Sequence, residues 1–312
     1  MTPKNLLKIR EIREIRKIRK IRDIRGPDMA ARRDMLRGIA SLSLGSLALG
    51  AIVPSAQAVV GGLPTNVGHA DSSPEWESLR GKLFGKREIN AGSGRVQLIV
   101  PLRAAYGASV PVKIVSGIGQ SGALYVKKMH LLVDKNPSPV AAVLDLTTEV
   151  GQADFETRLR VDEYSHVRVV SELSNGELHM DSRYVKTSGG CSAPPNRDGL
   201  HLLGKTVLKV SDGVRLEAPT TADVTVVHPN DTGFELNNVT VMFIPPHFVR
   251  SIKVSYASRR VFDAELDFSV SENPTLRFNF VPHGAGELRA EVEDSKEGRF
   301  AGTLMIDASK AG

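Results

Sequence analysis

The chain contains a single cysteine, Cys191, and its setting is the one in the sequence that argues for chemistry. Cys191 lies in residues 187–199, where Gly189 and Gly190 precede it and two prolines follow, a composition typical of a flexible and then extended linker. Such a segment buries little apolar surface. We therefore predict an exposed thiol on a mobile arm whose flexibility comes from Gly189 and Gly190, and about five extended residues would carry the thiol roughly 17 Å.

A lone cysteine leaves several uses of the thiol open. It forms no disulfide within the chain, and in an oxidising compartment it is either inert, paired with another molecule, or used chemically. A carrier thiol must react as the thiolate, which the neighbouring Lys186 and Arg197 could modestly favour. Composition alone divides evenly between a carrier thiol and an incidental linker thiol, and a disulfide-linked homodimer through Cys191 is a further option.

The other candidate motifs are weak. Residues 117–122 match G-x-G-x-x-G, but residues 127–133 have the pattern of a strand and not of the helix that a dinucleotide site requires, so we expect a β-turn. The eight histidines are scattered without a helical pair or a cysteine nearby. A metal site assembled only in space stays open, but the sequence predicts no catalytic residues, no metal and no cofactor.

The positive charge of the chain is concentrated at its start. The formal net charge is +6, and residues 1–58 alone carry +8, which leaves −2 for the rest. The remainder therefore lacks the basic footprint of a nucleic-acid-binding protein. Residues 1–28 repeat an Ile-Arg-x triplet whose period fits neither helix nor strand. We interpret them as an over-called start that is disordered, with a basic membrane-surface helix as the alternative.

Residues 29–58 have the three parts of an export signal. Arg32 and Arg33 form a twin-arginine-type basic region, residues 39–53 are apolar, and Ala56-Gln57-Ala58 is a small-x-small cleavage site. We predict cleavage after Ala58, a periplasmic location and no stable membrane insertion afterwards. An uncleaved membrane anchor is the alternative.

The remaining chain predicts an all-β fold. Residues 59–90 form a lead segment with a short helix, whose Trp76 and Leu79 should dock on the next domain. Residues 91–187 and 203–308 alternate apolar and polar positions between turn signals about every ten residues, which is typical of antiparallel sandwiches. We predict two immunoglobulin-like β-sandwich domains in tandem, joined by the linker 188–202. In the second domain the strand candidates are 224–227, 239–244, 252–256, 261–266, 276–281, 287–292 and 299–306.

Both halves resemble a known family of carrier proteins. Residues 91–191 resemble the SoxY subunit of the periplasmic sulfur-oxidation carrier, and residues 203–308 resemble its partner SoxZ. The first resemblance is carried by the motifs VPVKI at 110–114, HLLVDKNPSP at 130–139 and VKTSGGC at 185–191. The second is carried by HPNDTG at 228–233, IPPHFV at 244–249, VFDAEL at 261–266, SENP at 271–274 and GAGEL at 284–288.

The resemblance implies a non-catalytic carrier. Cys191 would hold a sulfur-containing group as a covalent adduct, such as a cysteine S-thiosulfonate, while other enzymes process it, and the SoxZ half would pack against the SoxY half. The fused arrangement is similar to carriers associated with quinoprotein (pyrroloquinoline-quinone) alcohol dehydrogenases. Partners are then sulfur-oxidation enzymes, or such a dehydrogenase or its cytochrome. The arm departs from the family pattern because it is tethered at both ends. A second hypothesis is an assembly module for the dehydrogenase, in which Cys191 is dispensable.

Overall fold

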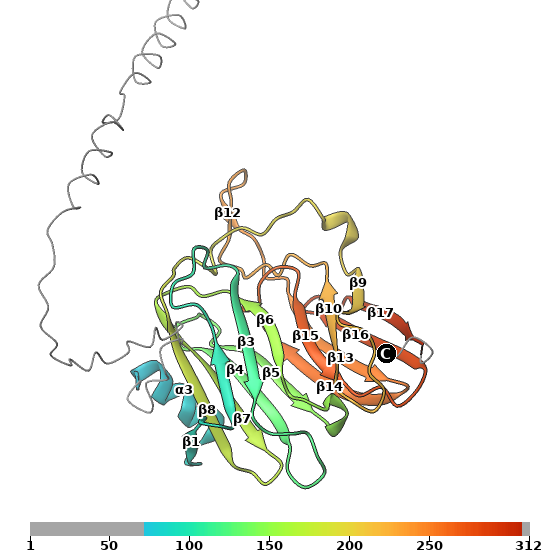
Figure 1. Ribbon diagram of the computed structural model, residues 1–312. Coiled ribbons are helices and arrows are strands. Elements are labelled where there is room, and N and C mark those ends of the chain that lie inside the picture. The colour runs from blue at the N-terminus through green and yellow to red at the C-terminus, as the bar shows by residue number, and fades with distance from the viewer. Residues whose placement is uncertain (1–71, 308–312) are drawn as a thin grey trace, which may run out of the picture. The chain divides into compact units, whose positions relative to one another are not determined.

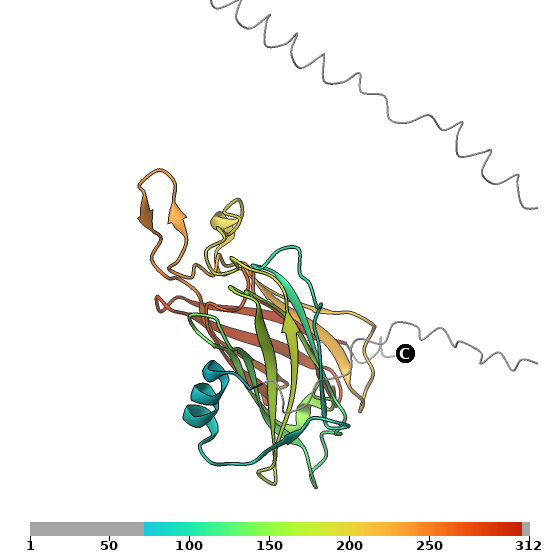
Figure 2. The same cartoon turned by 90° about the vertical axis from the view of Figure 1, so that its left-hand side faces the viewer.

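The computed structural model describes residues 72–307, which form an almost entirely β-stranded structure (Figure 1). The segments 1–28 and 29–58, with the predicted start and export signal, lie outside the described residues, as do the first residues of the lead segment. The strands pack as two layers (Figure 2). Within residues 72–307, no helix has the length and apolar character needed to cross a membrane.

The larger layer is a nine-stranded sheet in the order β1-β8-β7-β4-β5-β14-β13-β16-β17, antiparallel except where β1 pairs with β8. Its strands are β1 (Ile89–Ala91), β4 (Val126–Val133), β5 (Val140–Leu146), β7 (Ser165–Leu173), β8 (Leu178–Val185), β13 (Val249–Tyr256), β14 (Arg259–Leu266), β16 (Gly286–Asp294) and β17 (Arg299–Ile306).

The smaller layer is a six-stranded sheet in the order β2-β3-β6-β15-β10-β9. Its strands are β2 (Val96–Ile99), β3 (Val110–Ser116), β6 (Phe155–Leu159), β9 (Thr206–Val210), β10 (Thr220–Val226) and β15 (Thr275–Phe280). Two short 3-10 turns, η1 (Thr148–Val150) and η2 (Leu200–Leu202), lie in the connections.

Alternating side chains explain why these segments are strands with one face in the core. In β3, Val110, Val112 and Ile114 are buried, while Pro111 and Lys113 between them are exposed. β10 and β15 show the same alternation. The prediction of an all-β fold with antiparallel sandwich domains is confirmed.

The two halves are joined edge to edge, a feature that the sequence reasoning did not include. In the larger sheet, β5 of the first half pairs with β14 of the second, from Leu146 opposite Phe262 to Ala142 opposite Leu266. In the smaller sheet, β6 meets β15 at the single pair Glu156 and Arg277. One cluster of buried apolar side chains extends through both halves. The tandem domains therefore share their sheets and their core.

The predicted helix of the lead segment is present as α3 (Pro74–Phe84). Ser73 caps it, since its side chain accepts a hydrogen bond from the Trp76 amide at 3.1 Å. Trp76 and Leu79 are buried against Leu178 of β8 and Val170 of β7, which confirms their predicted docking role. Because α3 covers the outer face of β7, that strand is buried on both sides.

The second-domain prediction was wrong at residues 239–244. These residues do not form a sandwich strand. Instead the chain makes an exposed hairpin from β11 (Leu236–Asn237) and β12 (Met242–Phe243), which projects from the sandwich (Figure 2). The apolar residues Val239, Val241 and Phe243 gave the segment its strand-like pattern, but their side chains face solvent.

The loop at 117–122 lies between strands β3 and β4. The strand predicted after this loop is present as β4, so the G-x-G-x-x-G match does not open a helix, which is the context that a dinucleotide site requires.

Candidate functional site around Cys191

Cys191 lies buried at the junction of the two halves. Only 1% of its surface is exposed, so the prediction of an exposed thiol was wrong. Its backbone amide donates to Oδ1 of Asp162 at 3.1 Å, and its carbonyl accepts from Oγ1 of Thr232 at 2.6 Å. Asp162 belongs to the first half and Thr232 to the second, so both halves hold this residue in place.

The two glycines of the arm serve close packing in this structure. A Cβ atom at Gly190 would lie 2.4 Å from the carbonyl oxygen of Gly107 and 2.5 Å from that of Val161. Gly189 has a φ of +70°, a conformation that favours glycine. The Gly189 amide donates to the carbonyl of Asp162 at 2.7 Å, and the Gly190 amide to that of Val161 at 3.1 Å. The arm therefore lies along residues 161–162.

Arg160 is a large charged side chain that is buried at this site, with only 1% of its surface exposed. Its Nη1 donates to the carbonyls of Gly190, at 2.9 Å, and of Ala193, at 3.1 Å. Its Nη2 lies 3.4 Å from the carbonyl oxygen of Asn230 and 3.9 Å from Oε1 of the buried Glu235. One guanidinium thus connects the first half, the arm and the second half.

Glu235 balances this charge and shapes the loop beside Cys191. Its carboxylate accepts from the amides of Thr232, at 3.0 Å, and Gly233, at 3.1 Å. These bonds fix the loop that places the Thr232 hydroxyl on the Cys191 carbonyl. Removing one partner of a buried ion pair leaves the other charge buried and unpaired, which strongly destabilises the fold. We therefore treat the side chains that hold the arm as one unit. We call this unit the latch, and it consists of Arg160, Asp162, Thr232 and Glu235.

The Cys191 thiol is strongly protected from ionisation. Burial raises its pKa from the ordinary value of 9.0 to about 12, and the carboxylate of Asp162 adds to this. Arg160 acts in the opposite direction but does not compensate. The predicted help from Arg197 is not realised, because Arg197 pairs with Asp231. In the closed arm the thiol is therefore protonated and unreactive, and a disulfide between two chains would require the arm to leave this position.

Sequence reasoning missed the latch residues for identifiable reasons. The strand pattern around 155–161 places Arg160 on the polar, outward face. In the structure β6 ends at Leu159, and Arg160 turns inward. Asn136, in the motif at 130–139, supports this turn because its side chain bonds the Arg160 carbonyl and the Asp162 amide. Thr232 lies in the motif at 228–233, which was the available signal.

A second buried cluster lies near the same loop. Nε2 of His247 is 2.8 Å from Oδ2 of Asp294, and Nε2 of His228 is 3.6 Å from the same oxygen. The three groups are close enough to suggest a metal site. However, the Asn230 amide donates to Nδ1 of His228 at 3.1 Å, so the neutral ring carries its proton on Nε2. Burial lowers the pKa of His228 to about 4. The cluster is therefore arranged as two rings around one carboxylate, with no lone pair on Nε2 of His228 for a metal.

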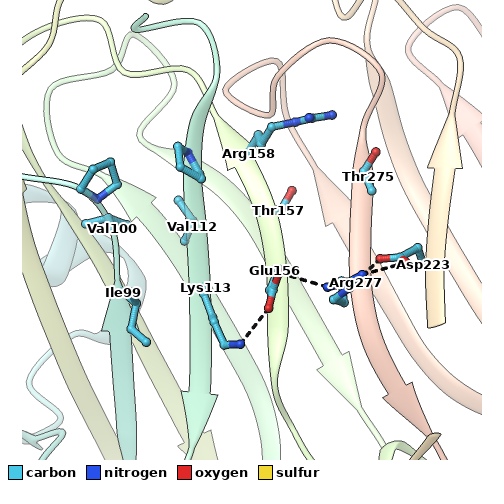
Figure 3. Close-up of a pocket in the computed structure, with 12 residues that line it drawn as sticks. Ile99, Val100, Val112, Lys113, Glu156, Thr157, Arg158, Asp223, Thr275 and Arg277 are labelled. Carbon is cyan, nitrogen blue, oxygen red and sulfur yellow. Dashed lines mark hydrogen bonds and ion pairs between the residues drawn. The ribbon is translucent and has the colours of Figure 1, made fainter. Parts of the chain in front are cut away.

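A cavity of about 390 Å³ lies on the smaller sheet, where β6 and β15 diverge (Figure 3). Its apolar wall includes Ile99, Val100 and Val112. Figure 3 shows charged side chains crossing the junction of the halves, with Lys113 2.8 Å from Glu156, Glu156 3.8 Å from Arg277, and Arg277 2.9 Å from Asp223. These four charges balance, and Arg158 adds a further positive charge to the lining. The lining holds no cysteine or histidine, so the thiol of Cys191 remains the reactive group around which a function can be argued.

Comparison with known proteins agrees with the division of the fold. Residues 80–191 match the family model of the sulfur oxidation protein SoxY, and residues 209–304 match that of the sulphur oxidation protein SoxZ. The SoxY match ends at Cys191. No curated protein matches the chain.

Two solved structures show weak likenesses. The sulfur carrier protein SoxY from Chlorobium limicola f thiosulfatophilum is 22% identical, with 38% of this chain and 100% of that chain covered and a TM-score of 0.30. A beta-glycosidase from Bacteroides vulgatus is 8% identical, with 68% of this chain and 24% of that chain covered and a TM-score of 0.21. TM-scores this low add nothing to the family matches. With a SoxY domain followed by a SoxZ domain, the chain belongs to the fused SoxYZ type of sulfur-oxidation carrier.

Proposed function

We propose that the chain is a non-catalytic carrier that holds a sulfur-containing group covalently on Cys191 and presents it to partner enzymes. The observation that carries this proposal is the position of Cys191. The only thiol of the chain stands where the SoxY match ends, and side chains from both domains bind its backbone. An incidental cysteine in a linker has no need of the contacts that Asp162, Thr232 and Arg160 make with the backbone of the arm.

The closed arm is the resting state in this proposal. Its thiol is protonated, so loading requires the arm to leave the latch and the thiol to lose its proton. With thiosulfate as substrate, the cysteine sulfur bonds to the terminal sulfur of thiosulfate. The proton passes to solvent, and two electrons pass to a haem-containing oxidoreductase. The product is a cysteine S-thiosulfonate. The carrier supplies the thiol, and the partner supplies the oxidation.

The proposal includes a periplasmic location. The twin-arginine-type pattern at residues 29–58 and the cleavage site at Ala58 support it, since both are features of exported chains. N-terminal sequencing of protein from the periplasm tests it, and the expected first residue is Val59. Mature protein that begins upstream of Val59 would contradict the cleavage prediction.

Intact-mass spectrometry tests the carrier function. Protein purified from cells grown on thiosulfate should carry an added mass that a thiol reductant removes. The added mass should be absent from Cys191→Ser. The matched control is Ser192→Ala, which leaves the thiol in place and should keep the adduct. A native thiol that is always free, together with unimpaired growth of the Cys191→Ser strain, would refute the proposal.

A second candidate function is an assembly module for a periplasmic quinoprotein alcohol dehydrogenase or its cytochrome. The burial of Cys191 favours it, because a thiol with a pKa of about 12 suits an inert structural residue. In that case the dehydrogenase should co-purify equally with the wild type and with Cys191→Ser. Loss of co-purification in Cys191→Ser would reject this candidate.

A further inference from the structure

The hairpin of residues 234–243 is the most apolar exposed feature among the described residues. Six large apolar side chains in this segment of ten face solvent, with exposed fractions from 45% at Phe234 to 91% at Val239. From Leu236 to Val249 the sequence contains no Asp, Glu, Lys or Arg. Figures 1 and 2 both show the hairpin projecting from the sandwich. Exposed apolar surface gathered in one place marks an interaction site.

The tip of the hairpin is also strained. Val241 has a φ of +54°, a backbone conformation that is strongly disfavoured for a β-branched residue. Asn or Gly would occupy this position at lower cost. Here Val is both strained and 72% exposed. Strain together with exposure makes the tip unfavourable for the isolated chain, and such strain is often found at functional sites.

The base of the hairpin is part of the latch around Cys191. The Ile244 amide donates to the Glu235 carbonyl at 2.9 Å and closes the hairpin. The side chain of the same Glu235 lies against Arg160 and binds the amide of Thr232, whose hydroxyl holds the Cys191 carbonyl. The hairpin is therefore connected to the Cys191 carbonyl through Ile244, Glu235 and Thr232.

We propose that this hairpin is the docking element for the enzyme that loads Cys191, and that its engagement opens the latch. The proposal rests on the carrier function and adds the surface of recognition. The hairpin projects from the sandwich, and its exposed side chains are apolar or uncharged because Glu235 is buried, so its partner is a protein with an apolar groove beside its active-site opening. A membrane surface fits less well, because interfacial binding elements pair apolar with cationic side chains. Thr232, two residues before the hairpin, binds the Cys191 carbonyl, so a partner docked at the hairpin would lie close to the arm.

The first test compares adduct occupancy in cells. The double variant Val241→Asn, Phe243→Ser removes apolar contact area and relieves the strained position. The matched control is Met305→Ser on β17, where 69% of the residue's surface is exposed, as against 67% for Phe243. We expect the hairpin variant to lose the reductant-removable adduct by at least about tenfold, with an unchanged unfolding transition, and the control to keep it. The single variant Val239→Ser should show an intermediate loss, which guards against misfolding of the double variant. Full occupancy in the folded hairpin variant would overturn the inference while leaving the carrier function intact.

The second test covers the case in which the wild type carries no adduct and the carrier function fails. A benzophenone amino acid at position 243 or, as control, at position 305 is photo-activated in cells. Two results are needed to support the inference. The first is a crosslink from position 243, and not from position 305, to a protein that can be identified. The second is that this protein, once purified, changes the rate of Cys191 labelling in the wild type but not in the hairpin variant. A crosslink only to a second copy of this chain, equal crosslinking at both positions, or no crosslink would overturn the inference.

Discussion

The native reactivity of Cys191 offers a direct measure of whether the arm is closed. At about pH 8 a thiol with its pKa at the ordinary 9.0 is about one-tenth thiolate, whereas a thiol with a pKa of about 12 is about one ten-thousandth thiolate. The native chain should therefore react with a disulfide reagent such as DTNB about a thousandfold more slowly than the chain unfolded in guanidinium. The absorbance of the released thiol reports both rates on the same sample.

The pH dependence separates ionisation from simple occlusion. For direct reaction of the closed thiol, the rate should keep rising tenfold per pH unit beyond pH 9, because its thiolate fraction has not levelled off. An exposed cysteine would level off near pH 9. Native labelling within about tenfold of the unfolded rate would show that the arm is not closed and would support the exposed arm that composition alone predicts.

A variant of the latch tests the same reasoning by another route. Thr232→Val keeps the side-chain shape but removes the hydrogen bond to the Cys191 carbonyl, worth about 1 kcal/mol. If labelling proceeds through transient opening, its rate should rise about fivefold. Thr225→Val is the matched control, because its hydroxyl bonds Thr275 on the smaller sheet and does not touch the arm. Equal rates in both variants would show that this hydroxyl does not hold the arm.

Three further predictions concern stability and the arm. Arg160→Met leaves Glu235 buried without its cation and should lower the free energy of unfolding in urea by about 3–5 kcal/mol; a loss below about 1 kcal/mol would contradict the latch. Gly190→Ala forces a Cβ against backbone atoms and should speed Cys191 labelling severalfold, whereas Gly122→Ala, with open space around it, should not. Burial, and secondarily Lys128, lowers the pKa of His130 to about 4. The unfolded chain therefore takes up more protons below about pH 6.5, so stability falls on acidification by about 2 kcal/mol between pH 7 and 5. In His130→Gln the free energy of unfolding should fall by about 2 kcal/mol less between pH 7 and 5 than in the wild type. The same pH dependence in both proteins would contradict the lowered pKa of His130.

Local pattern was sufficient to predict the helix and most of the strands, but not β9 at Thr206–Val210. The alternation in residues 110–114 and 299–306 and the Pro74 start of the helix are local signals, and the structure follows them. The hairpin at 236–243 escaped this reasoning because apolar residues predict a strand whether or not a partner strand exists. Only the assembled sheet decides which segments are covered.

The burial of Cys191 could not be predicted from composition. Gly and Pro around the thiol predict freedom only if nothing binds the arm. The groups that bind the arm are distant in the sequence. Arg160 and Asp162 lie 31 and 29 residues before Cys191, and Thr232 lies 41 residues after it. The resemblance to SoxY and SoxZ pointed to the thiol as the residue of interest, but it gave no indication that the thiol is buried.

The edge-to-edge joining of β5 with β14 and of β6 with β15 has a consequence for assembly. Each half taken alone would present open sheet edges, which in other proteins invite pairing with foreign strands and aggregation. In the fused chain β5 and β14 cover each other's edge along five residue pairs, whereas β6 and β15 meet at one pair. An isolated half would expose the edge that its companion covers in the fused chain, so we expect either half expressed alone to aggregate more readily than the whole chain.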